Sequence, residues 1–293
     1  MNYICRNLKY IATACVAAVI GITAVSVFGQ ETINKDKYKA AHKIKNKSFC
    51  ENQNWSSGDR VSFNELREMT IPATGSINVD GGQNGGISVK GEDRGDILVR
   101  ACVQSWGKTD DSAKAVAGNI KIATGGTIKA ENAGDDKNWS VSYQILVPRA
   151  TNLNLTAHNG GISISGTDGS AEFQTMNGGV SVGNLAGSVK GRTTNGGVNV
   201  SLSGTTWKGS GLDVQTTNGG VNISMPENYA AHVETGTVNG GFNSEIPSLT
   251  VETRDENGRR RSTKISTDIN GGGAPIRVIT TNGGVRISTP DRD

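Results

Sequence analysis

Two stretches of the chain, Asn177-Gly178-Gly179-Val180-Ser181-Val182 and Asn195-Gly196-Gly197-Val198-Asn199-Val200, show the pattern that decides the fold. The same Asn-Gly-Gly recurs with Val or Ile after it, and once with Phe242 in that place. A variant, Asn270-Gly271-Gly272-Gly273, lacks the apolar follower. The copies with an apolar follower begin at Asn84, Asn159, Asn177, Asn195, Asn218, Asn239 and Asn282.

Residues at fixed distances from the corner asparagine are alike in most copies. An apolar residue stands three positions after the Asn and another five after it, while Thr or Ala stands two positions before. Such alternation indicates a strand on each side of the corner, with every second side chain pointing inward. The inward positions nearest the corner stand two residues before the Asn and three residues after it, which is an odd separation along the chain. Strict alternation would place these two side chains on opposite faces, so the corner has to reset the alternation. Glycine suits this reset because it takes positive φ without a Cβ clash.

The spacing of the corners separates two possible folds. From Asn159 to Asn239 the successive corners are 18, 18, 23 and 21 residues apart. Asn-Gly is also a hairpin signal, so a meander of hairpins is the alternative, but a repeat near a fixed period is typical of a solenoid. We therefore predict an all-β, single-stranded parallel β-helix (β-solenoid) with coils of about 18–23 residues. Its corner amides are expected to stack as a ladder formed by Asn159, Asn177, Asn195, Asn218, Asn239 and Asn282.

Composition limits the class of protein. Gly accounts for 40 of the 293 residues but has no three-residue period, which excludes collagen. Lys and Arg number 30 against 27 Asp and Glu, and this near balance gives no sign of the basic face that a nucleic acid requires. We predict neither a nucleic-acid partner nor a cofactor.

Residues 1–29 are expected to be a signal peptide. Arg6 and Lys9 precede an apolar run that ends at Phe28-Gly29, where a small residue suits cleavage. The run is long, so an uncleaved signal anchor is the alternative, and it is the only membrane contact that we expect. Residues 30–48 follow as a Lys-rich tether. The protein is therefore expected to be exported, to the periplasm, the cell surface or the medium.

Two cysteines lie outside the leader, Cys50 and Cys102. An exported chain meets oxidising conditions, which favour a disulfide between them; two unpaired thiols are the alternative. In the predicted strand from Ile97 to Val103, Cys102 alternates with the apolar side chains and so lies on the opposite face. A flanking segment could reach it there.

The remaining segments are assigned around the repeats. Residues 49–70 are expected to form an irregular N-terminal cap, since an open sheet end needs cover. Residues 71–288 are expected to form the β-solenoid domain, and residues 289–293 a polar tail. The last two corners are 43 residues apart, about two coils, one of which would carry the charged excursion Thr253–Ser262.

One helix is predicted ahead of the regular repeats. It spans Asp110 to Ala117, with Asp110 or Asp111 near its N-terminus and alanines inside it. After it, Trp139 to Val147 alternates between apolar and polar residues and ends before Pro148, which is typical of a strand.

The stretch from Val141 to Gly166 carries a resemblance to a known family. It contains Tyr143, Ile145, Pro148, Leu153 and Leu155 ahead of Asn159-Gly160-Gly161-Ile162-Ser163-Ile164. In these residues the chain resembles the bacterial putative-adhesin family of unknown function, whose relatives include the head-GIN-type domains. The resemblance covers roughly Ile71 to Ser288. It implies an exported β-solenoid of strand–corner–strand repeats, and it brings no catalytic residues.

Candidate catalytic groups are sparse. The outward strand positions carry mainly Ser, Thr and Asn, and the paired acids Asp110-Asp111 and Asp135-Asp136 stand in capping or turn contexts. The three histidines lack metal-ligand spacing. The stretch Asp80–Gly86 lacks the repeated Asp of calcium-binding repeats. We therefore predict no catalytic, cofactor or metal site.

The most distinctive surface charge is the run Arg259-Arg260-Arg261 in the excursion. It is either a solvated hairpin tip or a contact for an anionic polysaccharide or lipid headgroup. The function we predict is a non-enzymatic cell-envelope module for adhesion, surface binding or structure, with envelope polysaccharide or a surface protein as its partner. The alternatives are a carbohydrate-active β-helix enzyme and a membrane-tethered envelope sensor.

Overall fold

The computed structural model describes residues 49–50, 59–250 and 262–290. The predicted leader, the tether and the arginine run all lie outside these residues. In the described part of the chain, no helix is long and apolar enough to span a membrane. The elements are β1 Val61–Pro72, β2 Ser76–Asp80, β3 Ile87–Glu92, β4 Asp96–Gly107, α2 Asp110–Gly118, β5 Ile120–Ala123, β6 Thr127–Asn132, β7 Trp139–Pro148, β8 Asn152–Ala157, β9 Ile162–Ser165, β10 Ala171–Thr175, β11 Val180–Gly183, β12 Ser188–Asn195, β13 Val198–Ser201, β14 Gly211–Asn218, β15 Val221–Ser224, β16 Ala231–Asn239, β17 Phe242–Ser244, the 3-10 helix η1 Pro247–Leu249, β18 Thr263–Ile269, β19 Pro275–Asn282 and β20 Val285–Ser288.

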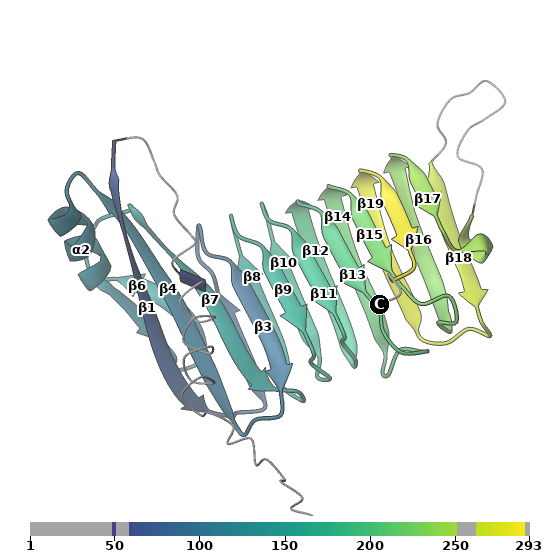
Figure 1. The fold of residues 1–293 in the computed structure, drawn as a ribbon, viewed down its shortest axis with the longest axis horizontal. Helices are drawn as coiled ribbons and strands as arrows, with labels where there is room; N and C mark the ends of the chain where they lie inside the picture. The colour runs from purple at the N-terminus through teal and green to yellow at the C-terminus, as the bar shows by residue number, and fades with distance from the viewer. Residues whose placement is uncertain (1–48, 51–58, 251–261, 291–293) are drawn as a thin grey trace, which may run out of the picture. The chain divides into compact units, whose positions relative to one another are not determined.

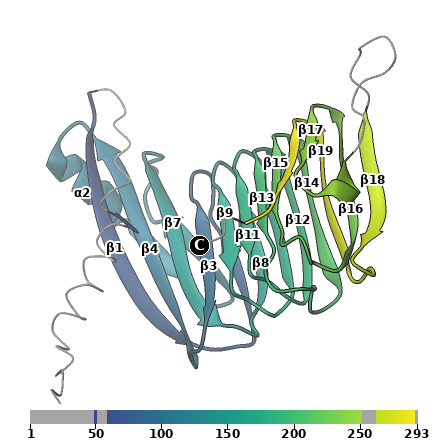
Figure 2. The same ribbon diagram turned by 45° about the vertical axis from the view of Figure 1, so that its right-hand side comes forward.

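The strands form two ten-stranded sheets, which Figures 1 and 2 show as two layers. Sheet A has the order β1-β4-β7-β3-β9-β11-β13-β15-β20-β17, and sheet B the order β18-β16-β19-β14-β12-β10-β8-β2-β6-β5. In each coil the strand ahead of the Asn-Gly-Gly corner lies in sheet B and the strand after it lies in sheet A. Equivalent strands pair in parallel with like residues side by side. The all-β prediction is confirmed, and the corners do not form hairpins.

Both sheets are mixed, so the prediction of a purely parallel fold is wrong at the ends of the stack. β1 pairs antiparallel with β4, and β4 with β7, while β5 pairs antiparallel with β6 and β18 with β16. The expected irregular cap is also wrong for Val61–Pro72, which pairs with β4 along its whole length. A paired strand satisfies backbone groups that an irregular segment would leave open at the sheet edge.

The stack departs from chain order near its C-terminal end. β19 pairs in parallel with both β14 and β16, and β20 pairs with both β15 and β17. The last coil of the chain therefore lies between the two coils that precede it in sequence. Successive corners are not neighbours here, because Asn282 stands between Asn218 and Asn239. The 43 residues that separate the last two corners were expected to hold two coils. This expectation is wrong, because β18 in this stretch pairs antiparallel with β16 and is not part of a further coil.

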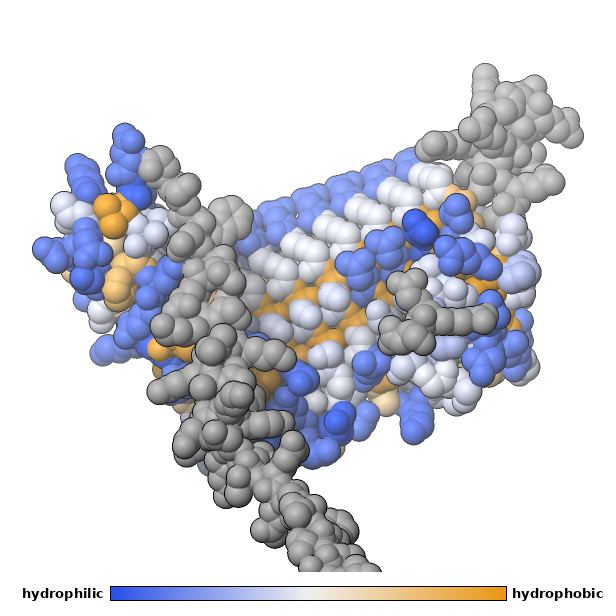
Figure 3. All heavy atoms as spheres, viewed as in Figure 1, coloured by the Kyte–Doolittle hydropathy of each residue, from blue (hydrophilic) through white to orange (hydrophobic). Residues whose placement is uncertain are grey.

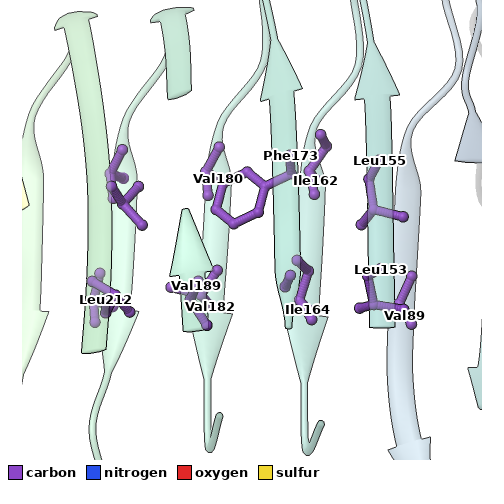
Figure 4. Close-up of a cluster of buried hydrophobic side chains, with 14 of the residues drawn as sticks. Val89, Leu153, Leu155, Ile162, Ile164, Phe173, Val180, Val182, Val189 and Leu212 are labelled. Carbon is purple, nitrogen blue, oxygen red and sulfur yellow. The ribbon is translucent and has the colours of Figure 1, made fainter. Parts of the chain in front are cut away.

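Apolar side chains from both sheets fill the space between them. Figure 4 shows the ring of Phe173 of sheet B between Val180 and Ile162 of sheet A. Phe173 is the large side chain in this group, and Gly191 on the next strand makes room for it. A Cβ on Gly191 would stand 1.9 Å from the phenylalanine ring. A low aromatic content is therefore enough for this thin core.

The corner glycines are required for close stacking and not for an unusual backbone conformation. None of them has φ in the left-handed range, so the expected use of positive φ is wrong. A Cβ on Gly178 would lie 2.1 Å from the carbonyl oxygen of Gly160, and one on Gly196 would lie 2.1 Å from that of Gly178. The first glycine of each corner thus lets successive backbones approach. The variant corner differs, because Gly271 to Gly273 all have positive φ.

The predicted helix and disulfide are both present. α2 begins one residue after Thr109, whose hydroxyl oxygen accepts a hydrogen bond from the backbone N–H of Ser112. The N-cap is therefore Thr109 and not Asp110 or Asp111, near which the sequence placed the start of the helix.

Cys50 and Cys102 form a disulfide with their Cα atoms 5.3 Å apart. Cys102 is fully buried on the outer face of β4, where Cys50 lies against it.

Close stacking makes Gly178→Ala costly. We expect the free energy of unfolding to fall by about 1–3 kcal/mol, since the added methyl group meets a backbone carbonyl that has to move. Gly95→Ala is the matched control, because nothing lies within 4 Å of its Cβ position and its φ is not left-handed. Its effect should stay within about 0.5 kcal/mol. Urea unfolding followed by circular dichroism measures both variants, and equal losses would contradict the stacking explanation.

Breaking the disulfide should destabilise the fold by about 4 kcal/mol, because the bond closes a long loop and restricts the unfolded chain. The two cysteines are 52 residues apart. Thermal unfolding with and without a reductant measures the effect, and the Cys50→Ala/Cys102→Ala double variant should unfold at the temperature of the reduced protein. An unchanged Tm on reduction would contradict this prediction.

Candidate functional site

The corner asparagines form one hydrogen-bonded row along the stack. Each Nδ2 donates to the Oδ1 of the neighbouring asparagine on the side nearer β2, as Asn177 does to Asn159 at 2.7 Å. This is the arrangement expected of an amide ladder, and its effect on stability stays a prediction. All the bonds run in one direction, so the ladder has a donor end and an acceptor end. In spatial order the row is Asn84, Asn159, Asn177, Asn195, Asn218, Asn282 and Asn239, with bonds of 2.7–3.0 Å.

A row of threonines fixes the corners from inside. Thr193 is fully buried, and its Oγ1 donates to the carbonyl oxygen of Gly178 at 2.8 Å. Thr175 makes the equivalent bond to Gly160 in the preceding coil at 2.7 Å. These bonds satisfy hydroxyls that burial would otherwise penalise. Such bonds hold the corner backbone at Gly160, Gly178, Gly196, Gly219 and Gly283.

The outer face of sheet A carries a flat strip of small, uncharged groups. Ser88, Ser163, Ser181, Asn199 and Asn222 stand side by side on β3, β9, β11, β13 and β15, and we call this row with the adjoining corner glycines the polar strip. A shallow depression of about 340 Å³ is lined by parts of it. Figure 3 shows stripes of like hydropathy that cross the strands. The polar strip is therefore a nearly flat surface that exposes hydroxyl and amide groups.

The outer face of sheet B is charged instead. Glu172, Lys190, Asp213, Arg277 and Glu234 stand side by side on successive strands, so the sign of the charge alternates along the row. Arg277 pairs with Asp213 at 2.8 Å and lies 3.4 Å from Glu234. Arg277 is thus paired with acidic groups on both neighbouring strands. The two sheets therefore differ in surface chemistry.

Three side chains form a hydrogen-bonded row at the C-terminal end of sheet B. His232 Nδ1 lies 2.7 Å from Asp268 Oδ1, and Nε2 lies 3.2 Å from Ser266 Oγ. The order Asp–His–Ser is that of a nucleophile triad, but the Asp268 side chain is 67% exposed, so the group lies open to solvent. We interpret the row as a set of cross-strand side-chain interactions that stabilises the pairing of β16 with β18. The described residues contain no cluster of three or more His, Cys, Asp or Glu placed to hold a metal ion.

A deeper cavity, of about 590 Å³, lies at the donor end of the ladder. Asn84 and Asn159 line it, together with Lys129, Lys137 and Trp139. Sequence reasoning missed this cavity, because these residues come from four separate segments and share no motif. The signal that could have found it is the break in the repeat, since no Asn-Gly-Gly joins the strands before and after residues 133–138.

One residue that lines this cavity, Lys129, has a shifted pKa, and so do two core tyrosines outside its lining. A hydrogen bond with Glu131 raises the pKa of Lys129, and the charge of Asp80 adds to the rise. Burial raises the pKa of Tyr143, and it raises that of Tyr229 to about 12. The Tyr143 hydroxyl is buried without a hydrogen-bond partner in the described chain. Both tyrosines therefore stay neutral and act as core residues.

Residues 34–288 match the family described as Toastrack DUF4097. The chain belongs to the Toastrack family. The resemblance to bacterial adhesins of unknown function is thereby confirmed. The matched range includes the antiparallel N-terminal strands, so the family unit extends beyond the regular coils of this Toastrack chain.

Solved structures similar to this Toastrack chain include three bacterial proteins of low sequence identity. A putative cell adhesion protein from Clostridium sporogenes is 12% identical, with a TM-score of 0.42, and the match covers 78% of this chain and 100% of that one. A putative adhesin from Bacteroides fragilis is 12% identical, with a TM-score of 0.27, over 78% and 97%. A putative lipid binding protein from Parabacteroides distasonis is 11% identical, with a TM-score of 0.29, over 77% and 96%. No curated protein matches the chain.

Removing one amide should weaken the ladder. Asn195→Ala deletes a bond to each neighbour, and we expect a loss of about 1–2 kcal/mol in the free energy of unfolding. Asn222 is a poor control because its Nδ2 donates to Asn199 at 2.9 Å. Asn154→Ala, at an exposed position on β8, is the better one and should be nearly neutral. Chemical unfolding of both variants tests the ladder, and equal effects would count against it.

Proposed function

We propose that this Toastrack chain is a non-enzymatic, exported cell-envelope module that binds an extended polymer along the polar strip of sheet A. The observation that carries the proposal is the in-register row from Ser88 to Asn222 beside the corner glycines. Repeated equivalent groups suit a partner that is itself a repeat, such as an envelope polysaccharide or an extended segment of a surface protein.

The physical chemistry of the strip favours such a partner. Its groups recur at the strand spacing of about 4.7–4.9 Å, so a polymer can make the same contact several times. Serine side chains lose little rotamer freedom on binding. The row from Ser88 to Asn222 contains no charge whose desolvation would oppose contact. The stacked corners hold the strip rigid, so little ordering is required of the protein.

Export is part of the same proposal. The leader sequence supports it, as does the Cys50–Cys102 disulfide, since such bonds persist in oxidising compartments. Adhesion is one use of a polymer-binding face, and structural cross-linking of the envelope is another. Both uses require the strip to be accessible.

A bulky residue on the strip should abolish binding. We expect Ser181→Trp to reduce the amount of protein retained by bead-immobilised envelope polysaccharide by at least about tenfold, because an indole on the flat surface blocks close approach. Gln174→Trp, at an exposed position on the outer face of sheet B, is the matched control and should bind normally. Thermal unfolding checks that both variants fold. Retention of Ser181→Trp at the level of the control would place the binding face elsewhere.

A further inference from the structure

The cavity at the donor end of the ladder exists because the corner repeat stops there. β6 pairs in parallel with β2, and β7 pairs in parallel with β3, so these strands form one more level of the stack. Residues 133–138, which join them, contain no Asn-Gly-Gly. The row of corner amides therefore ends at Asn84, and the cavity of about 590 Å³ opens between that corner and the ends of β6 and β7.

The last asparagine of the ladder, Asn84, places a hydrogen-bond donor at this cavity. Asn84 Oδ1 accepts from Asn159 at 3.0 Å, and in the described chain no acceptor is seen for Asn84 Nδ2. Hydrogen-bonded amides in a chain polarise one another, and all the links here run in the same sense. The terminal N–H groups are thus suited to an electron-rich oxygen.

The cavity lining also contains two cations. Lys129 and Lys137 both line the cavity. Lys129 Nζ is held by Glu131 at 2.9 Å, whereas Lys137 is exposed and forms no ion pair among the described residues. Asp80 is the acidic residue in the lining. Lys137 is therefore the group that can pair with a ligand carboxylate.

Trp139 supplies a flat apolar surface. Its side chain is half-buried against the core and also lines the cavity. The indole Nε1 donates to the carbonyl oxygen of Asp136 at 2.9 Å, which fixes the orientation of the ring. An aromatic plane held in this way can pack against the C–H face of a sugar ring. A few polar groups around one aromatic surface are typical of a small-molecule site, and the volume lies in the usual range.

We propose that this cavity binds an acidic sugar residue, a hexuronate, of an envelope polysaccharide. Trp139 packs on the ring, Lys137 pairs with the carboxylate and Asn84 Nδ2 donates to a sugar oxygen. The site is separate from the polar strip of sheet A and does not depend on it. It adds recognition of one charged residue to a protein whose polar strip takes a neutral, extended chain.

Calorimetric titration of the full chain with trigalacturonate tests the proposal. We expect binding that weakens as salt rises, and at least about tenfold weaker binding of the methyl-esterified trisaccharide, which lacks the charge. Tri-aspartate supplies the same carboxylates without a sugar ring and should bind no better than the ester. Equal affinity for trigalacturonate and its ester would overturn the proposal, and so would equal affinity for tri-aspartate.

Two variants assign the binding to this cavity. Lys137→Gln should weaken trigalacturonate binding by about tenfold, while Lys121→Gln, an equal loss of charge at an exposed position on β5, should leave it unchanged. Ser181→Trp should also leave it unchanged, so failure of the polar strip and failure of the cavity are distinguished. Full binding by Lys137→Gln, with an unaltered Tm, would overturn the assignment.

Discussion

The structure depends on the approach of one backbone corner to the next. Where Gly178 faces the carbonyl oxygen of Gly160, there is space for a hydrogen atom and not for a methyl group. This spacing brings the amides of neighbouring asparagines within hydrogen-bonding distance and lets a buried threonine reach the adjacent carbonyl. Glycine, asparagine and threonine therefore recur together because one distance requires all three. The apolar rows between the sheets then fall into register as a consequence.

That shared requirement explains what the sequence could reveal. Columns of like residues predicted the strands, the inward positions and the row of amides, because each depends on a local repeat. The disulfide followed from the expected export of the chain and from the face on which Cys102 lies. The sequence could not show that Asn282 stands beside Asn218, since every corner is compatible with every other and nothing local specifies which are neighbours. The strand Val61–Pro72 was missed because it is partly covered on both faces and its alternation is weak.

The candidate sites differ in the same way. The polar strip is visible in the sequence, as serines and asparagines at fixed positions after the corner. The cavity is not visible, because it arises where the repeat is interrupted and Trp139 and Lys137 meet a corner some fifty residues away. In a repetitive fold, regular surfaces come from what the repeats share, whereas a particular pocket comes from the place where they stop. Searching for interruptions is therefore as informative as searching for motifs.

The insertion of the last coil between its two predecessors has a consequence for biogenesis. Up to β15, each new coil can add to the growing end as it emerges from the ribosome or the translocation machinery. The coil of β16 and β17 has no such surface to join, because its neighbours β19 and β20 are synthesised after it. This coil can therefore pair with the stack only after β19 and β20 have been synthesised. These two strands then complete both sheets together, and the large sequence separation of their contacts slows folding. Loss of even a short C-terminal stretch, such as a premature stop codon would cause, would therefore leave open strand edges in both layers and invite association between copies.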